Sequence, residues 1–272
     1  MGKPMQNVRR KPKDEGGHWY TAEGFPMHKV PYKDPSKGFR STTVRDARKL
    51  DLYASVNTIG DILKRAMLDN WQKNLVIETC YLFPKYEGES LSNYNSRIME
   101  AYQLEASKAP EEGTAIHNAI EAALQRKPYD LDYQRYVEMA ERVIIEQEWK
   151  ILHLERRLVP KLCGYGGTAD LLAEDKFGNL IIGDWKSKET KKKKILVYPS
   201  YKMQLCGYKQ GFAVEEEFKK YENILMCDIF LSKDEDRKEV IWVDKEDEVK
   251  YTKIFNWCNK IFREEKGLSY ES

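Results

Sequence analysis

The stretch "GYGGTADLLAEDKFGNLIIGDWKSK", residues 164–188, contains two short apolar segments separated by "DKFGN". Apolar runs of this length bounded by turn residues are typical of buried strands, so the stretch predicts a β-hairpin. The second strand ends in Asp184, Trp185 and Lys186 instead of staying apolar, and Asp170 interrupts the first strand. Charged residues are rare in buried strands unless they are paired, so these three need an explanation.

The pairing of the two strands brings the charged residues together. A turn centred near Phe177 places Asp170 opposite or diagonal to Asp184, with Cβ atoms roughly 5 to 8 Å apart. Lys186 lies two residues beyond Asp184 and therefore on the same face of the strand. The alternative is an exposed hairpin with a simple Asp184–Lys186 ion pair, but the apolar neighbours on both strands argue against exposure.

Two carboxylates at this separation repel each other and raise each other's pKa. A divalent cation removes the conflict, because carboxylate and carbonyl oxygens are the ligands that Mg²⁺ and Mn²⁺ select. Lys186 beside such a site would stabilise negative charge on a phosphate or help to activate a water molecule. The hairpin therefore predicts a metal site suited to phosphate chemistry.

A predicted helix upstream, in "EEGTAIHNAIEAAL" at residues 111–124, carries a second set of polar residues. Thr114 is placed as its N-cap. His117 and Glu121 share one face of the helix with Ile120 and Leu124, which is the face expected to be buried. The spacing alone leaves open a core role or a functional cluster for His117 and Glu121. An imidazole beside carboxylates would favour Mn²⁺ over Mg²⁺.

Two downstream features have open interpretations. The predicted helix "SYKMQLCGYKQGF" places Tyr201, Gln204 and Tyr208 on one face. Spacing favours packing for Tyr208 and a rim position for Gln204; the alternative is that both hold a DNA backbone or orient the metal cluster. The run "KSKETKKKK" from Lys186 to Lys194 has six lysines and one acid. Such runs are mostly solvated loops, but next to a phosphate site this one suits a contact with nucleic acid.

The order of predicted elements gives the fold class. Helical periodicity covers the following segments: Val44 to Phe83, Asn95 to Lys108 (ended by Pro110), a third helix after "EEGT", and Tyr133 to Trp149. Strands are then expected in "ERRLVPKLCGY", "GGTADLLAE" and "NLIIGDWK", followed by helix, strand, strand and helix. We therefore expect an α/β (α+β) fold with a central mixed sheet flanked by helices and an N-terminal helical region.

The domain organisation follows from the same pattern. Residues 1–40 are expected to form a polar arm, disordered or wrapped on the body, which buries little. A single domain is expected over 41–272. Its parts are a mainly helical segment at 41–155, a sheet core at 156–245 and a C-terminal helix at 246–272.

Composition excludes several classes of protein. Hydrophobic residues make up 41% and charged residues 33% of the chain, with a net charge of +2. No apolar run approaches the ~18 residues needed to span a bilayer, and no secretory signal is present, so we expect a cytoplasmic protein without a membrane partner. The five cysteines are scattered without a CxxC pair, which argues against zinc and iron–sulfur sites. No GxxxxGK[ST] loop, GxSxG elbow or HExxH helix occurs.

Four of these segments together resemble a known family. "GTADLL" followed fourteen residues later by "DWKS" resembles the core of the PD-(D/E)XK nucleases. "GTAIHNAIE" and "QLCGY" are similar to the histidine helix and the Gln-x-x-x-Tyr motif of the RecB-like branch of that superfamily. This branch includes phage-encoded exonucleases and the mitochondrial genome maintenance exonuclease. The resemblance covers about residues 40 to 245, and "RSTTVRDARKLDLYASVNTIGDIL" resembles the segment that precedes the nuclease domain in phage-encoded members.

The resemblance implies a restriction-endonuclease-like core and a role for each matching residue. It implies metal ligation by His117, Asp170, Asp184 and the main-chain carbonyl of Trp185. Lys186 would be the catalytic lysine and Glu121 a supporting acid at or near the metal. The DNA would be contacted or positioned by Gln204, Tyr208, Ser187, Lys188 and Thr114.

The function implied by the resemblance is a Mg²⁺- or Mn²⁺-dependent DNA exonuclease. A role in phage DNA recombination, replication or degradation, in the host cytoplasm and beside a single-strand annealing protein, is what the N-terminal resemblance adds. A single-strand or structure-specific endonuclease is the alternative within the same class. A nucleic-acid-binding module that has kept the fold and lost the chemistry is the alternative from another class.

Overall fold

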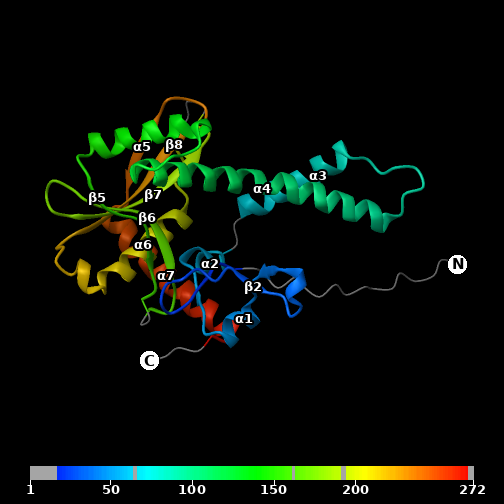
Figure 1. Cartoon of the computed structure of the whole chain (residues 1–272), viewed down its shortest axis with the longest axis horizontal. Coiled ribbons are helices and arrows are strands. Elements are labelled where there is room, and N and C mark those ends of the chain that lie inside the picture. The colour runs from blue at the N-terminus through cyan, green and yellow to red at the C-terminus, as the bar shows by residue number, and fades with distance from the viewer. Residues whose placement is uncertain (1–16, 64–65, 161–162, 191–193, 269–272) are drawn as a thin grey trace.

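The protein is built around one five-stranded mixed β-sheet (Figure 1). The computed structural model describes residues 17–63, 66–160, 163–190 and 194–268. The strands run in the order β5 (Lys150–Leu158), β6 (Gly167–Glu174), β7 (Leu180–Lys188), β8 (Ile224–Ser232) and β9 (Lys238–Trp242). β7 and β8 are parallel and every other neighbouring pair is antiparallel. The expected fold class, a mixed sheet flanked by helices with an N-terminal helical region, is confirmed.

Helices cover both faces of this sheet. On one face, α4 (Leu91–Leu124) and α5 (Gln134–Glu146) pack on apolar side chains of the sheet. On the other face lie α6 (Pro199–Ala213), α7 (Lys245–Lys266) and the short α2 (Val56–Gly60). α6 connects β7 to β8, which is the crossover that a parallel pair of strands requires. The sheet is therefore buried on both sides, and a polar residue inside it needs a specific reason to be there.

The hairpin register agrees with the prediction from the turn. Leu171 lies opposite Gly183 and Glu174 opposite Leu180, as a turn centred near Phe177 requires. The side chains of β7 alternate, with Leu180 and Ile182 in the core beneath α6 and α7, and Ile181 and Trp185 in the core beneath α4 and α5. Asp184 and Lys186 consequently face α6, while Trp185 packs on the other side of the sheet.

Helix α4 is much longer than the sequence indicated. It runs without interruption for 34 residues and contains Pro110. The expected stop at Pro110 and the expected N-cap at Thr114 are both wrong, because Thr114 is inside the helix and its hydroxyl donates to the Pro110 carbonyl at 3.0 Å. The first half of α4 packs beside α3 (Ala66–Leu82), and the pair projects away from the sheet (Figure 1).

The expected helix from Val44 to Phe83 is also divided. It comprises α1 (Val44–Lys49), β4 (Tyr53–Ala54), α2 and α3. The helices α1 and α2 are too short to show a clear helical period, and β4 is a strand. Ser55 caps α2 and separates it from β4. The first core strand begins at Lys150, earlier than the expected "ERRLVPKLCGY". Its first half has no fully buried side chain, so the sequence there lacks the apolar run by which a core strand is recognised. From β6 onward the expected elements are confirmed.

The described part of the N-terminal segment belongs to the folded body. It contains β1 (Trp19–Tyr20), β2 (Lys29–Pro31) and β3 (Phe39–Ser41), and β1 pairs with β4. Trp19 is fully buried in the core beneath α7, with its ring 6.3 Å from that of Phe262. The expectation that this segment buries little is therefore wrong for Trp19 and Tyr20. The first sixteen residues of the expected arm lie outside the described residues.

Burial of Trp19 leads to a prediction on stability. We expect Trp19→Ala to lower the free energy of unfolding by about 3–5 kcal/mol, since it leaves a large cavity in the core. Urea unfolding followed by circular dichroism measures the change. Phe39→Ala is the matched control, because Phe39 lies in the same segment and is 69% exposed. An equally small effect of both substitutions would contradict the assignment of Trp19 to the core.

Among the described residues, every helix is too short or too polar to cross a bilayer. All five cysteines are free thiols.

Candidate metal centre

The site lies where β6 and β7 separate. Their ladder is regular from Glu174 to Leu171 and ends before Asp170 reaches Asp184. In its place, the backbone N–H of Trp185 donates to the Asp170 carboxylate at 2.8 Å. The N–H and C=O of one strand residue point toward the same neighbouring strand, so the Trp185 carbonyl also faces the β6 side. The opening where β6 and β7 separate, the fork, is thus lined by the Asp170 carboxylate and by main-chain polar groups.

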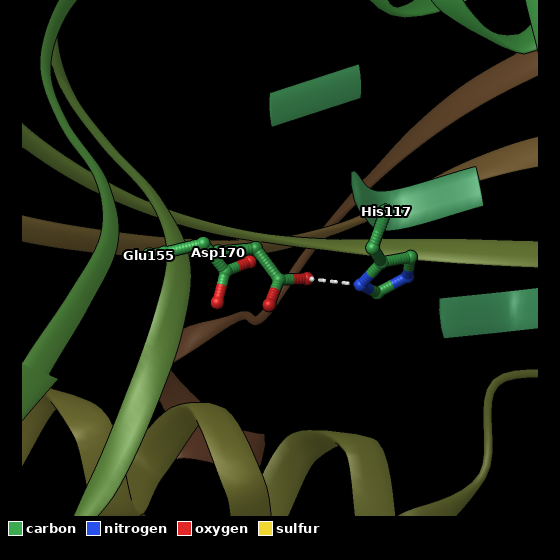
Figure 2. Close-up of side chains that lie close together, drawn as sticks. All are labelled: His117, Glu155 and Asp170. Atoms are coloured by element: carbon green, nitrogen blue, oxygen red, sulfur yellow. Dashed lines mark ion pairs between the residues drawn. The ribbon is translucent and has the colours of Figure 1, made fainter. Parts of the chain in front are cut away.

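Three potential ligands meet at this fork (Figure 2). His117, Glu155 and Asp170 each offer one ligand atom, and these atoms lie within 4.8 Å of one another. The Nδ1 atom of His117 is 3.4 Å from Oδ2 of Asp170, and Figure 2 shows the Asp170 carboxylate pointing at the imidazole with Glu155 beside it. α4 supplies the histidine, β5 the glutamate and β6 the aspartate, so the group depends on the tertiary fold.

Glu155 is the functional candidate that sequence reasoning missed. On β5, Leu154 pairs with Leu171 and Arg156 with Ala169, which places Glu155 next to Asp170. Its φ of 49° lies in the left-handed region, which is costly for a residue with a Cβ and is found preferentially at functional sites. In the sequence, Glu155 begins the charged run Glu155–Arg157, which gives no sign of an inward-pointing acid.

The carboxyl groups of this cluster hold their protons more tightly than usual. Burial is the main cause, and the Asp170, Glu121 and Asp184 charges add to it, so that the pKa of Glu155 is raised to about 8. Burial and the Asp184 charge raise the pKa of Asp170 to about 6, against the opposing charges of His117 and Lys186. Acids crowded in this way gain from a cation that offsets their charges.

Asp184 and Lys186 form the second half of the site, on the α6 side of the sheet. The ammonium of Lys186 pairs with Oδ2 of Asp184. Burial alone would lower the pKa of Lys186, but the charges of Asp184 and Asp170 outweigh burial and raise it above its ordinary value. The lysine is therefore charged at neutral pH. Asp184 is 1% exposed and lies outside the group formed by His117, Glu155 and Asp170.

Helix α6 holds this pair through Gln204. The Gln204 amide N–H donates to Oδ1 of Asp184 at 2.8 Å and to the Tyr208 hydroxyl at 3.0 Å, and its Oε1 accepts from Lys186 at 3.2 Å. Gln204 is 9% exposed, so the rim position that its spacing favoured is wrong. Tyr208 packs as spacing indicated: a Cβ at Gly167 would lie 2.7 Å from its ring.

Aromatic rings border the lysines of β7. The Lys186 ammonium lies 4.7 Å from the ring centroid of Tyr201, and the Lys188 ammonium lies 4.0 Å from that of Tyr198. Each contact orients a flexible side chain through the attraction between a cation and a ring face. Lys188 also donates to the Leu196 carbonyl at 3.0 Å.

The remaining candidates are placed as follows. Glu121 accepts from Gln125 at 2.8 Å, and its charge acts on Glu155, but it is outside the ligand group. Ser187 follows Lys186 and is partly exposed, and Thr114 is exposed on α4. Lys191 to Lys193 of the lysine run lie outside the described residues.

The raised carboxyl pKa values predict how stability depends on pH. Glu155 and Asp170 keep protons in the folded state at pH values where the unfolded chain has lost them, so the folded state binds more protons. Stability is complete below the unfolded pKa values and falls as pH rises through the folded ones. We expect the metal-free protein to lose on the order of 3 kcal/mol between pH 5 and pH 8. Urea unfolding in EDTA measures this loss.

The matched variant for the pH prediction is Glu155→Gln, which removes one of the acids with a raised pKa. It should flatten the decline in stability, and Mn²⁺ should reduce the decline in the wild type. A wild-type stability that rises steadily from pH 5 to pH 8 would contradict the burial of these acids.

Comparisons with known proteins give only distant structural likenesses. No protein-family model and no curated protein matches the sequence. The fold is similar to that of SSO0001, with 14% identity and a TM-score of 0.30 over 72% of this chain and 87% of that one. It is also similar to a "Putative exonuclease" from Eubacterium rectale, with 14% identity and a TM-score of 0.35 over 70% of this chain and 74% of that one.

Proposed function

We propose that this chain is a Mg²⁺- or Mn²⁺-dependent deoxyribonuclease of the PD-(D/E)XK type, RecB-like branch, acting as an exonuclease. One observation carries the proposal: a histidine, two aspartates and a partly buried, charged lysine converge on the fork between β6 and β7. They come from the segments of the sequence that resemble the motifs of that family.

The donor set fits a hard divalent cation. The side chains of His117, Glu155 and Asp170 can converge on one ion. The pKa values of the two acids are raised, and the charge of a bound cation would lower them. Asp184 and the Trp185 carbonyl border the same fork and would complete the oxygen-rich set that Mg²⁺ and Mn²⁺ take. The imidazole favours Mn²⁺. The bound ion would supply a Lewis acid that activates water and neutralises phosphate charge.

The residues of the chain perform the remaining tasks. Lys186 presents a fixed positive charge to the phosphate, where negative charge grows as the phosphodiester bond breaks. Gln204 bonds to both Asp184 and Lys186 from α6, which restricts the two side chains before substrate arrives. Tyr208 in turn orients the Gln204 amide.

DNA is the proposed partner of this surface. Ser187 and Lys188 follow Lys186 along β7, and the Lys188 ammonium lies over the ring of Tyr198. Both residues would contact the phosphates beyond the scissile bond. Thr114 on α4 would contact the strand from the opposite side. A role in phage recombination, replication or DNA degradation in the host cytoplasm, beside a single-strand annealing protein, is the biological setting that we propose.

Digestion of defined DNA substrates tests the proposal. Linear single- and double-stranded DNA, labelled at one end and blocked at each end in turn, is incubated with the protein and Mg²⁺ or Mn²⁺. We expect release of short products from free ends, abolished by EDTA. Cleavage of covalently closed single-stranded circles would point to an endonuclease instead.

Calorimetric titration of Mn²⁺ separates an enzyme from an inactive binding module. We expect a single site whose occupancy is lost in Asp170→Asn. A protein that binds DNA without binding Mn²⁺, and without cutting any of the substrates, would show that only the fold has been kept.

A further inference from the structure

A buried acid that the proposed mechanism does not use lies directly beside the site. Asp228, in the middle of β8, is the register partner of Asp184 on the parallel strand β7. It is 1% exposed, and neither of its carboxylate oxygens has a hydrogen-bond partner among the described residues. A buried carboxylate without partners is costly, so its presence in the core calls for a compensating use.

The Asp228 side chain points to the same face of the sheet as Asp184 and Lys186. Along β8, Cys227 and Ile229 belong to the core under α4 and α5, so Asp228 and Phe230 alternate toward α6. Phe230 confirms this direction, because its ring lies 6.3 Å from that of Tyr201 on α6. The charges of Lys186 and Lys202 favour the ionised form of Asp228, while burial and Asp184 oppose it and raise its pKa to about 7.

Asp184 already has both of its oxygens engaged. Oδ1 accepts from Gln204, and Oδ2 pairs with the ammonium of Lys186. A divalent cation that binds Asp184 meets that ammonium as a like charge at short range, which is strongly unfavourable in a buried site. Lys186 therefore has to leave Asp184 when the cation binds, and the ammonium of a partly buried lysine that leaves one carboxylate is stabilised by another nearby.

We propose that Asp228 is the positioning residue of Lys186, receiving its ammonium when Asp184 turns to the metal. This inference rests on the proposed function. Asp228 then keeps the lysine charged and at a fixed place beside the phosphate, at the cost of an unpartnered carboxylate in the metal-free protein. The exchange involves no covalent step: one ion pair opens and another closes.

Asp228→Asn tests the inference, because it removes the charge and keeps the size of the side chain. We expect kcat to fall by about 10- to 100-fold, with the KM for DNA and the Kd for Mn²⁺ within twofold of the wild type. The metal-free variant should unfold at a midpoint about 3 °C higher than the wild type, since a neutral amide is less costly to bury than a carboxylate. Cys227→Ala is the control on the same strand and the opposite face; it should lower the midpoint and leave kcat unchanged.

The outcomes separate this inference from the function on which it rests. A wild-type protein that cuts no DNA overturns the proposed function. A wild type that cuts, with Asp228→Asn equally fast, overturns the positioning role alone. A loss of Mn²⁺ affinity in Asp228→Asn that accounts for the lost rate also overturns it, because Asp228 would then act as a ligand. A lowered unfolding midpoint with normal kcat would show a purely structural role.

Discussion

Replacing Lys186 with alanine is expected to reduce the rate of DNA cleavage by about 10³-fold while DNA binding persists. The Lys186 side chain is only 17% exposed, and its ammonium pairs with Asp184 and is oriented by Gln204 and the ring of Tyr201. In Lys186→Ala, a water molecule in the place of the ammonium is neutral and less ordered, so the negative charge that develops on the phosphate loses its stabilisation. Single-turnover cleavage of labelled DNA with saturating Mn²⁺ measures the loss, and a filter-binding assay in Ca²⁺ measures the affinity for DNA.

The control for this variant is Lys176→Ala. Lys176 lies in the turn at the other end of the same hairpin and pairs with Glu148 there. Its removal should change neither rate nor affinity. Lys186→Ala leaves the Asp184 carboxylate buried without its cation, at a cost of about 3 kcal/mol, so circular dichroism in the presence of Mn²⁺ must show an intact fold. A folded Lys186→Ala variant with wild-type rate would remove the lysine from the mechanism.

Replacing Glu155 with glutamine is expected to weaken Mn²⁺ binding by about 10- to 100-fold and to reduce cleavage in parallel. Glu155 shares the ligand group with His117 and Asp170, and its backbone is held in the left-handed region at that position. The amide keeps the size of the side chain but supplies a weaker, uncharged ligand. Isothermal titration with Mn²⁺ gives the affinity directly, and raising the Mn²⁺ concentration should restore most of the rate.

Glu217→Gln serves as the control for Glu155→Gln. Glu217 is an acid near the same strand that pairs with His153 and Arg156 and belongs to no ligand group in the described residues. Its Mn²⁺ affinity should equal that of the wild type. If Glu155→Gln also bound Mn²⁺ with unchanged affinity, the cation would have to be held by His117, Asp170 and Asp184 without Glu155.

The sequence predicted the part of the site that depends on local periodicity. A short turn sets the register of a hairpin, so the pairing of Leu171 with Gly183 could be foreseen from the position of Phe177. The two-residue period of a strand likewise placed Lys186 on the face of Asp184. The helical period placed Gln204 and Tyr208 on one side of α6, although it could not show that Gln204 is buried.

The rest depends on contacts between distant segments. Glu155 reaches the site through a backbone conformation that no residue type announces, and its partner Asp170 comes from a neighbouring strand. Trp19 is buried because α7, from the other end of the chain, covers it. Pro110 normally indicates the end of a helix, but here it is exposed and the helix continues through it, held by packing on either side.

The length of α4 has a mechanical consequence for the cluster. At 1.5 Å per residue its 34 residues span about 50 Å, and His117 lies about 40 Å along the helix from the projecting end at Leu91. Pro110 lies between that projecting end and His117, and the helix lacks one backbone hydrogen bond there. It is therefore the point at which α4 bends most easily, so a displacement of the projecting half is taken up at Pro110 before it reaches the imidazole.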